Sequence, residues 1–564
     1  MTTHPEDGCP SFQPGIDSSG SLFSRYNEQK RLDERHLKFN VSALLAAAAE
    51  SVSRRKEDIK SFRKFAEGGF NRVFEVTLRD GFRSIVRLPY PSTQPKFFAT
   101  SSEVATMDLV RRHGVPTPLV YKYCADANNP VGSEYMVMEK VPGRRLTDIW
   151  YELCDKERVK ILGAIVDQEA KLFNIPLPAY GSIYRTSDLP ESMNHAKLEA
   201  DAGKFYVGPN ASLEYWSGTR SQLEMSRSPG KESRSLYREC HKLIHCAIAT
   251  TCQQVLEGGA KKELAWLHSH GKRRLPFDRE YREMFNYARV DPEEHISSLE
   301  NFLKVTSHTV PVEEWLQKPV IRHPDLSPNN IFVDDNCNIT SIIDWQHTTV
   351  LPLYLNAGIP SLFQNYGDPD SEELKKPEYP SNLDELDEID RLKDIELYRR
   401  RHAHYYYVGA TITKFNPHYK AMSHDRGLFR KKLYQHAVGP WEGNSIPLKA
   451  DLVMLSRNWS ELTKGSIEGE KENESCPISF QQQEAEQIMV KMLEQEDIDK
   501  RMDIIRDAIG ISTDGWVSCE RFDDAVTAAK DMKAQALSYA ENEWEREMTD
   551  QHWPFDDFDE DGCR

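Results

Sequence analysis

Three polar residues near the middle of the chain have the types and spacing of a phosphoryl-transfer site. Asn330 follows Asp325 by five residues, and Asp344 follows fourteen residues later. A carboxylate can accept a hydroxyl proton, and one amide oxygen and one carboxylate can share a hard cation such as Mg²⁺, which keeps several waters for substrate phosphates. A base, a metal-holding Asn and a metal-holding Asp are the parts that phosphoryl transfer requires.

The residues between Asn330 and Asp344 predict the β-hairpin that would position both side chains. Residues 331–333 and 339–343 are apolar and largely β-branched, and residues 334–338 between them are rich in the turn formers Asp and Asn. Because the two arms are nearly equal, we expect Asn330 and Asp344 side by side at the open end, roughly 5 Å apart as in an antiparallel pair. A surface hairpin with turn-forming Asp and Asn, without chemistry, is the alternative interpretation.

The motif His323-x-Asp325-x4-Asn330 followed by Asp344 resembles the catalytic and metal loops of the kinase superfamily. Trp345-Gln346 stands where protein kinases carry the rest of D-F-G, and no A-P-E follows, so the chain resembles the aminoglycoside phosphotransferase/choline kinase-like family instead. Residues 39–462 are similar to a fungal group within it that includes the altered inheritance of mitochondria proteins.

This resemblance implies a two-lobed, protein-kinase-like α+β fold with a small β-rich N-lobe and a large, mostly helical C-lobe. It also implies ATP and Mg²⁺ as cofactors. Asp325 would be the base that orients the acceptor hydroxyl, and Asn330 and Asp344 would hold the metal. We expect His323 to be structural, hydrogen-bonding behind the loop.

A glycine-containing turn between two predicted strands would cover the phosphates. Strand-like segments at 61–66 and 71–78 flank Gly68 and Gly69, and Asn71 begins the second strand. Two glycines let backbone N–H groups approach a phosphate without an intervening Cβ. A tight hairpin also favours glycine for its own sake, so the functional interpretation depends on the position of this turn ahead of Asp325.

Arg87 occupies the place where kinases carry a lysine that contacts phosphates. It lies on a third predicted strand, 82–88, joined to the second by Asp80-Gly81, and alternation puts it on the same face as Ile85. Arginine also binds phosphate, but its rigid fork is not equivalent to an ammonium group. The resemblance makes Glu103, in a helix predicted over 100–113, the partner of Arg87. The alternative is a solvated first-turn acid favoured by the helix dipole.

A further strand is predicted over 134–138 and runs into a segment that resembles the hinge between the lobes. There the main-chain groups of Glu139 and Val141 would hydrogen-bond adenine.

Two side hypotheses concern the large lobe. Two His and three Cys within 240–252 suggest zinc, but only Cys252 shares the face of the two His and no C-x-x-C pair occurs, so a structural helix is preferred. The basic and aromatic run 398–407 is typical of nucleic-acid surfaces, but it follows the acidic segment 383–396 in a helical pattern. We therefore predict a salt-linked helix of the large lobe.

After residue 462 the composition changes. Residues 463–476 read as a linker, and 484–509 and 522–544 predict a helical hairpin that docks on the large lobe or on a protein partner, followed by an acidic tail. Asp514-Gly515-Trp516 between the helices lacks the spaced acids of an EF-hand. The predicted divisions are a flexible leader (1–38), the N-lobe (39–143), the C-lobe (144–462) and this extension (463–564).

Composition narrows the partners. The net charge is −17, from 72 basic and 89 acidic residues, which disfavours general nucleic-acid and anionic-membrane binding. Ten irregularly spaced cysteines indicate a reducing compartment, and no apolar run reaches 18 residues, so no membrane span is expected. Residues 1–40 hold five basic and six acidic residues, unlike an acid-poor transit peptide. We expect the cytoplasm, with the mitochondrion as the alternative implied by the resemblance.

Two functions follow from these observations. The first is an ATP- and Mg²⁺-dependent kinase that transfers the γ-phosphate to a hydroxyl of an unidentified small molecule. The alternative is a catalytically impaired pseudokinase that acts as a scaffold, with a role in mitochondrial maintenance implied by the resemblance, and the arginine at position 87 is the feature in its favour.

Overall fold

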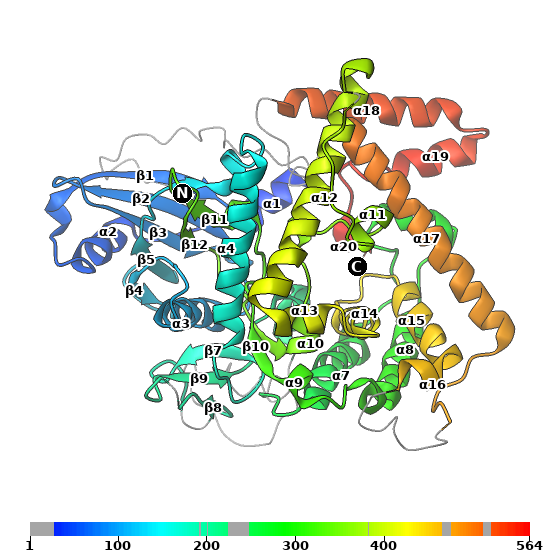
Figure 1. The fold of residues 1–564 in the computed structure, drawn as a ribbon, viewed down its shortest axis with the longest axis horizontal. Helices are drawn as coiled ribbons and strands as arrows, with labels where there is room; N and C mark the ends of the chain where they lie inside the picture. Colours follow the sequence, from blue (N-terminus) through cyan, green and yellow to red (C-terminus); the bar gives the residue numbers. More distant parts are fainter. Residues whose placement is uncertain are drawn as a thin grey trace.

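The computed structural model describes residues 27–190, 193–199, 201–223, 248–381, 383–464, 475–510 and 521–563. Two lobes are visible in Figure 1, with a sheet at one side and helices at the other. The predicted α+β, two-lobed, kinase-like fold with a C-terminal helical extension is confirmed. The predicted division points between domains stay predictions.

The N-lobe is built on a five-stranded antiparallel sheet with the order β1-β2-β3-β5-β4. The turn between β2 and β3 contains Gly81 at φ +88°, a conformation that glycine adopts without strain. Strands were predicted here because β-branched and aromatic residues alternate between short turn segments. Their bounds are β1 Ile59–Glu67, β2 Asn71–Leu78, β3 Arg83–Pro89, β4 Val120–Cys124 and β5 Tyr135–Glu139.

Two helices pack on this sheet. Helix α2 (Val41–Glu50) begins where the Asn40 side chain accepts from Ala43 N, and its buried Leu44 packs with Phe74 of β2 and Val86 of β3. Helix α3 (Phe98–Arg112) instead contributes to the large core that continues into the C-lobe. It begins two residues before the predicted start, so Glu103 lies beyond the first turn.

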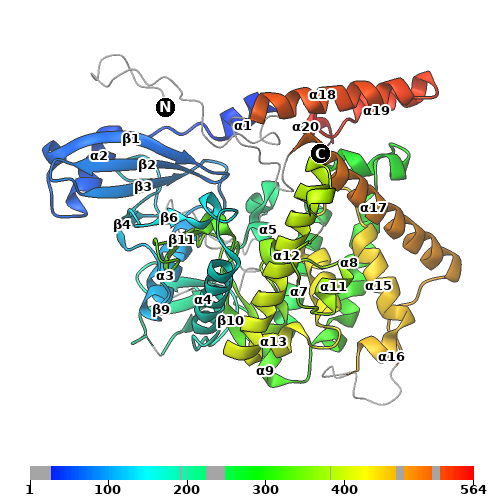
Figure 2. The same ribbon diagram turned by 45° about the horizontal axis from the view of Figure 1, so that its top comes forward.

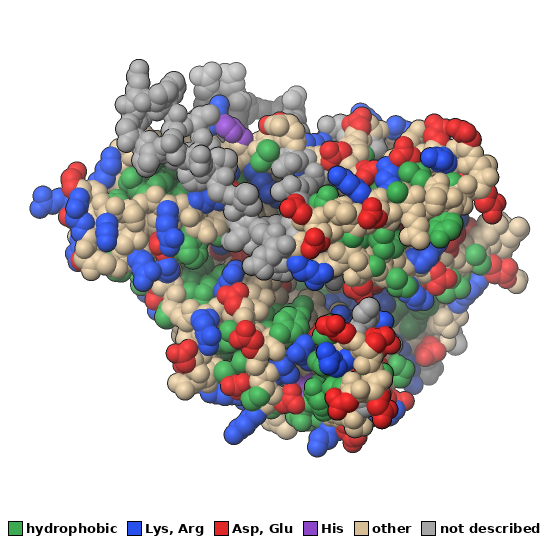
Figure 3. Space-filling model, turned by 90° about the horizontal axis from the view of Figure 1, so that it is seen from above, with side chains coloured by type: hydrophobic (Ala, Val, Ile, Leu, Met, Phe, Trp, Pro, Cys, Tyr) green, Lys and Arg blue, Asp and Glu red, His purple; other side chains and the backbone are tan. Residues whose placement is uncertain are grey.

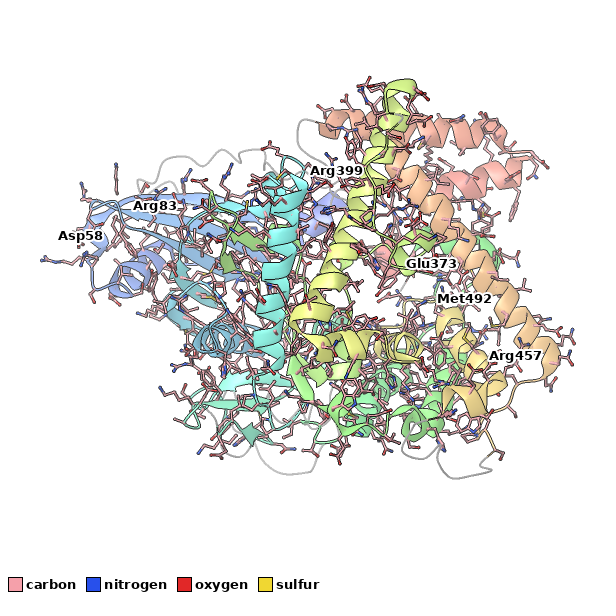
Figure 4. All side chains as sticks on the ribbon, in the orientation of Figure 1. Asp58, Arg83, Glu373, Arg399, Arg457 and Met492 are labelled. Carbon is pink, nitrogen blue, oxygen red and sulfur yellow. The ribbon has the colours of Figure 1, made fainter. Side chains whose placement is uncertain are left out.

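The C-lobe is organised around two long helices that pack side by side, α4 (Asp155–Phe173) and α12 (Glu388–Lys414) (Figure 1). The predicted salt-linked helix at 398–407 is part of α12. Its Arg401 binds Asp368 at 2.7 Å, and Arg399, labelled in Figure 4, lies 5.3 Å from the ring centre of Tyr151.

Short strands and helices complete the C-lobe. The strands are β6 Arg144–Arg145, β7 Ser182–Arg185, β8 Ala196–Lys197, β9 Phe205–Gly208, β10 Pro319–Ile321, β11 Ile331–Val333, β12 Ile339–Ile342 and β13 Val350–Pro352. The remaining helices are α5 Leu213–Trp216, α7 Cys252–His270, α8 Pro292–Val305, α9 Glu314–Gln317, α10 Leu353–Asn356, α11 Pro369–Glu372, α13 Asn416–Met422, α14 Gly427–Val438, α15 Ile446–Arg457 and α16 Trp459–Leu462.

The C-terminal extension docks on the large lobe. Helix α17 (Gln482–Ile509) packs along α15, and Met492, labelled in Figure 4, contacts two clusters of buried side chains between them. Helix α18 (Phe522–Tyr539) is shorter than predicted, and α19 (Glu543–Gln551) and α20 (Glu560–Cys563) follow it. Most of the predicted linker and Asp514-Gly515-Trp516 lie outside the described residues.

The chain's two ends meet. Helix α1 (Glu28–Glu34) lies beside the C-terminal helices in both Figure 1 and Figure 2, and Asn27 Nδ2 donates to Glu560 at 2.8 Å. Arg31 also pairs with Glu560. Residues 28–34 therefore depart from the expected flexible leader, because ion pairs with the distant C-terminus order them; residues 1–26 lie outside the described part.

Candidate functional site

The predicted hairpin forms, and its register places the two metal candidates one residue away from direct opposition. Ile331 pairs with Ile342, and Ile343 N donates to the carbonyl of Asn330 at 2.9 Å, so Asn330 lies opposite Ile343. Asp344 follows at φ +66°, in the left-handed region that non-glycine residues rarely adopt. The expectation of a direct Asn330–Asp344 pair is therefore wrong by one residue, and the turn at Asp344 sets the direction of its side chain.

A third strand attaches this hairpin to the predicted hinge. Strand β6 pairs with β11 through Arg144 and Arg145, in a sheet of order β12-β11-β6. Gly143 has φ +97°, and a Cβ there would meet the Val333 carbonyl oxygen at 2.5 Å. The segment that leads from the N-lobe into the C-lobe is therefore held against β11, the strand that directly follows Asn330.

Asp325 is exposed beside Asn330. The Asn330 amide donates to the Asp325 carbonyl and to its Oδ2, each at 2.9 Å, and the Ser327 hydroxyl donates to the same carboxylate at 3.3 Å. With its Nδ2 used in this way, Asn330 holds the Asp325 loop and its amide oxygen is turned away from that carboxylate. An exposed carboxylate in a fixed loop is what a hydroxyl-accepting base needs.

His323 lies behind the loop, with the contacts of a structural residue. Asp325 N donates to His323 Nδ1 at 3.1 Å, and Nε2 donates to the Ile343 carbonyl at 2.8 Å. The ring packs edge-on against the buried Trp345, with ring centres 4.6 Å apart. Burial lowers the pKa of His323, so the ring is neutral and links the loop before Asp325 to the strand before Asp344.

Arg87 joins the N-lobe to Asp344. Its Nη2 donates to Asp344 Oδ1 at 2.7 Å, and its Nη1 pairs with Glu103 of α3. Glu103 is 4% exposed, so the alternative of a solvated first-turn acid is wrong, because the helix starts earlier and this position faces inward. The structure thus brings together the Arg87–Glu103 pair that the resemblance implied.

The charges in this cluster influence one another. Burial raises the pKa of Glu103 to about 7. Burial alone would lower the pKa of Arg87, but the charges of Glu103 and Asp344 raise it, so the guanidinium stays protonated. Burial alone would also raise the pKa of Asp344, and the Arg87 charge instead lowers it. The Asp344 side chain is 45% exposed, so an ionised carboxylate faces water beside a buried cation.

These residues fit a magnesium ion by chemistry. Asp344 supplies an accessible carboxylate and Asn330 an amide oxygen, both hard ligands, and Mg²⁺ binds through one or two such groups while retaining water. Within the described ranges, no group of three or more His, Cys, Asp or Glu side chains is placed to hold a metal. Of the proposed zinc ligands only Cys252 is described; it is buried at the start of α7 and contacts the Tyr180 hydroxyl.

The predicted phosphate-covering turn is open. Gly68 and Gly69 are exposed, and a Cβ built at either would meet no atom within 4 Å. The protein's own packing therefore does not require glycine at these positions. Asn71 is only 7% exposed and turns away from the turn toward Arg87, so its side chain is placed differently from the phosphate-covering role predicted for it.

Of the predicted hinge residues, Glu139 ends β5, and its N–H donates to the Leu119 carbonyl at 2.8 Å. That donor is engaged within the N-lobe, so only the carbonyl of Glu139 remains for the predicted adenine contact. Val141 lies in the segment between β5 and β6.

Sequence reasoning missed two sets of residues that support the site. Gln346 is 6% exposed and contacts both Arg87 and Asn71. Beneath the Asp325 loop, buried Glu169 of α4 binds Arg322 at 2.8 Å and accepts from Tyr407 of α12. Gln346 could have been found from the sequence, because it directly follows Asp344-Trp345. Glu169 and Tyr407 had no comparable sequence signal, since each is simply a polar residue within a helical segment.

Comparisons with known proteins agree with the geometry. The model described as "Phosphotransferase enzyme family" matches residues 61–359, more than half of the chain. A subtelomeric hrmA-associated cluster protein of Aspergillus fumigatus is 30% identical over 509 residues, covering 88% of this chain and 96% of that protein. Altered inheritance of mitochondria protein 9, mitochondrial, of Lachancea thermotolerans is 23% identical over 483 residues, 82% of this chain and 74% of that one.

Solved structures were also compared. Plasmodium vivax ethanolamine kinase is 12% identical, with 86% of this chain and 96% of that one covered and a TM-score of 0.33. The streptomycin–ATP ternary complex of APH(2")-IIa is 10% identical, with 77% and 99% covered and a TM-score of 0.34.

Proposed function

The chain belongs to the phosphotransferase enzyme family, and from that premise we propose that it is an ATP- and Mg²⁺-dependent kinase for a hydroxyl group of a small molecule. The observation that carries the proposal is the arrangement of Asp325, Asn330 and Asp344 on one loop and hairpin, with Arg87 and Glu103 reaching them from the N-lobe. These are the positioning and electrostatic parts that phosphoryl transfer requires.

In this proposal each group has one task. Asp325 accepts the proton of the acceptor hydroxyl, and Asn330 and Asp344 hold Mg²⁺, which neutralises charge on the β- and γ-phosphates. The Gly68–Gly69 turn covers the phosphates through the Gly69 N–H, since the Gly68 N–H already donates to the Asn71 carbonyl at 3.0 Å, and Arg87, braced by Glu103, lies beside them. Main-chain groups near Glu139 and Val141 receive adenine.

The second candidate, a pseudokinase scaffold, is favoured by one observation. The Arg87 guanidinium is already bonded to Glu103, Asp344 and Gln346, where a kinase lysine would be a mobile point charge. The word "mitochondrial" in the names of the Lachancea and Saccharomyces relatives supports the mitochondrion as the site of either function. No helix in the described residues is long and apolar enough to cross a membrane.

The kinase proposal is tested by phosphate transfer from labelled ATP to a panel of small hydroxyl compounds. We expect at least one acceptor for the wild type, and Asp325→Asn should reduce the rate by about 10²–10⁴-fold while Mg²⁺·ATP binding is retained. Asp335→Asn is the matched control, because this carboxylate lies on the same hairpin and is 95% exposed. Transfer by Asp325→Asn at the wild-type rate would contradict the role of Asp325.

A further inference from the structure

Arg87 is surrounded by hydrogen-bonding groups from both lobes. Besides Glu103 and Asp344, the Gln346 amide oxygen accepts from Arg87 Nη2 at 2.9 Å and from the Asn71 amide at 2.7 Å. If the Asn71 amide is turned over, its oxygen accepts from Arg87 Nε at 3.0 Å and Nη2 at 2.6 Å. The Asn71 amide accepts from Arg87 only when it is turned over; in the other orientation it donates to Gln346.

The two amides come from different parts of the site. Asn71 begins β2 directly after the Gly68–Gly69 turn, whereas Gln346 lies two residues beyond Asp344. Both side chains are buried, at 7% and 6% exposure, and their contact spans the two lobes. A neighbouring contact also joins the two lobes. The Phe70 ring lies edge-on to the His347 ring, with ring centres 5.3 Å apart.

This arrangement bears on how Asp344 becomes available to a cation. In the structure Asp344 Oδ1 is bonded to Arg87, so a metal that binds through this oxygen must draw it away from the guanidinium. The Arg87 side chain is only 10% exposed, and a buried guanidinium donor left without an acceptor is costly. Gln346 already accepts from the same Nη2, and it is neutral, so it can satisfy that donor without adding a competing charge.

We propose that Asn71 and Gln346 form an amide clamp that keeps Arg87 in place when Asp344 turns from the guanidinium to a divalent cation. Both are positioning residues that act through Arg87. The clamp rests on the proposed function, because it needs a metal at Asp344. It assigns to Asn71 a role different from covering phosphates.

The test is the Mg²⁺ dependence of ATP binding, measured by calorimetry on the full chain at a series of Mg²⁺ concentrations and in EDTA. Gln346→Met keeps the length of the side chain but removes the acceptor. We expect it to raise the Mg²⁺ concentration at half-saturation by about fivefold, the effect of one hydrogen bond, with ATP binding in EDTA nearly unchanged.

Two further variants separate this role from a general loss of structure. Asn71→Ala removes the other half of the clamp from the opposite lobe and should shift the Mg²⁺ dependence in the same direction. Gln535→Met, at an exposed position on α18, should change nothing. A purely structural role would weaken binding equally with and without Mg²⁺.

The outcomes distinguish the two proposals. If the wild type shows Mg²⁺-dependent binding and both Gln346→Met and Asn71→Ala keep its Mg²⁺ dependence, the clamp is overturned and the kinase proposal stands. If the wild type binds no Mg²⁺·ATP, both are overturned. Should Gln346→Met fail to fold, Asn71→Ala decides the question.

Discussion

At single residues, the site is distinguished by features that the protein's own packing does not explain. Gly68 and Gly69 would tolerate a Cβ sterically, Asp325 is exposed in a fixed loop, and Asp344 has a left-handed backbone. Unfavourable backbone conformations are retained where the surrounding structure imposes them, often at functional sites. A phosphate and a metal bound as proposed would explain all of these features.

The glycines provide a test at this scale. We expect Gly69→Ala to leave the thermal unfolding midpoint within a few degrees of wild type, because its Cβ meets open space, while weakening ATP binding. Gly143→Ala is the contrasting variant, since its Cβ would meet the Val333 oxygen at 2.5 Å and its φ is +97°. It should lower the midpoint clearly. Unchanged ATP affinity in Gly69→Ala would argue against a phosphate at this turn.

The same scale shows what the sequence could predict. Asp325, Asn330 and Asp344 were found because their spacing is local to one loop and hairpin, and the Arg87–Glu103 pair followed from the family's order of motifs. Gln346 was missed because it contacts Asn71 and Arg87 of the other lobe, which lie more than 250 positions away in the sequence. The register error at Asn330 arose because the residue types of the two arms did not reveal the hairpin's register, which shifts between Phe332 and Val333.

At the level of elements, the loop that carries Asp325 is held by a buried ionic network between helices. Arg322, directly before His323, binds Glu169 of α4 and the carbonyl oxygens of Asn356 and Gly358, at 2.6–2.9 Å. Tyr407 of α12 donates to the same glutamate. Helices α4 and α12 therefore meet at the residue that begins the loop. Periodicity predicted the helices but not this pairing, because it depends on how α4 and α12 cross.

Removing one partner from this network should be costly. Glu169 is 0% exposed, so Glu169→Leu would leave the Arg322 charge buried without its counter-ion. We expect it to reduce the free energy of unfolding by about 3–5 kcal/mol, measured by urea denaturation. Asp335→Ala breaks the exposed pair with Arg144 and serves as the control, with no measurable effect expected. Wild-type stability in Glu169→Leu would show that the network does not support the loop.

At the scale of the whole molecule, the extension connects the chain's two ends across the large lobe. Figure 3 shows acidic and basic side chains interspersed on one face of the molecule. Ion pairs between opposite charges likewise join α1 to α20. The Glu560 carboxylate accepts a hydrogen bond from the Asn27 amide and forms ion pairs with Lys30 and Arg31. Although burial alone would raise the pKa of Glu560, these partners lower it below its ordinary value of 4.5.

The lowered pKa predicts how the contact depends on pH. Since the folded-state pKa lies below 4.5, the contribution of Glu560 is fully present above pH 4.5 and is lost as the pH falls through the folded-state pKa. Glu560→Gln should therefore speed hydrogen exchange of residues 27–34 relative to wild type at pH 7, and the difference should shrink as the pH is lowered below 4.5. The control is Asp503→Asn, which removes the ion pair between Asp503 and Arg506 on α17. Equal exchange at pH 7 would mean that the contact does not hold α1.

The most direct test of the central claim is calorimetric binding of ATP to the wild-type chain, with Mg²⁺ and with EDTA, beside Asp344→Ala and the control Asp335→Ala. We expect binding that requires Mg²⁺ in the wild type and in Asp335→Ala. Asp344→Ala should lose the difference between Mg²⁺ and EDTA, because the metal's carboxylate is gone. No binding by the wild type at millimolar nucleotide, or an undiminished effect of Mg²⁺ in Asp344→Ala, would contradict the claim.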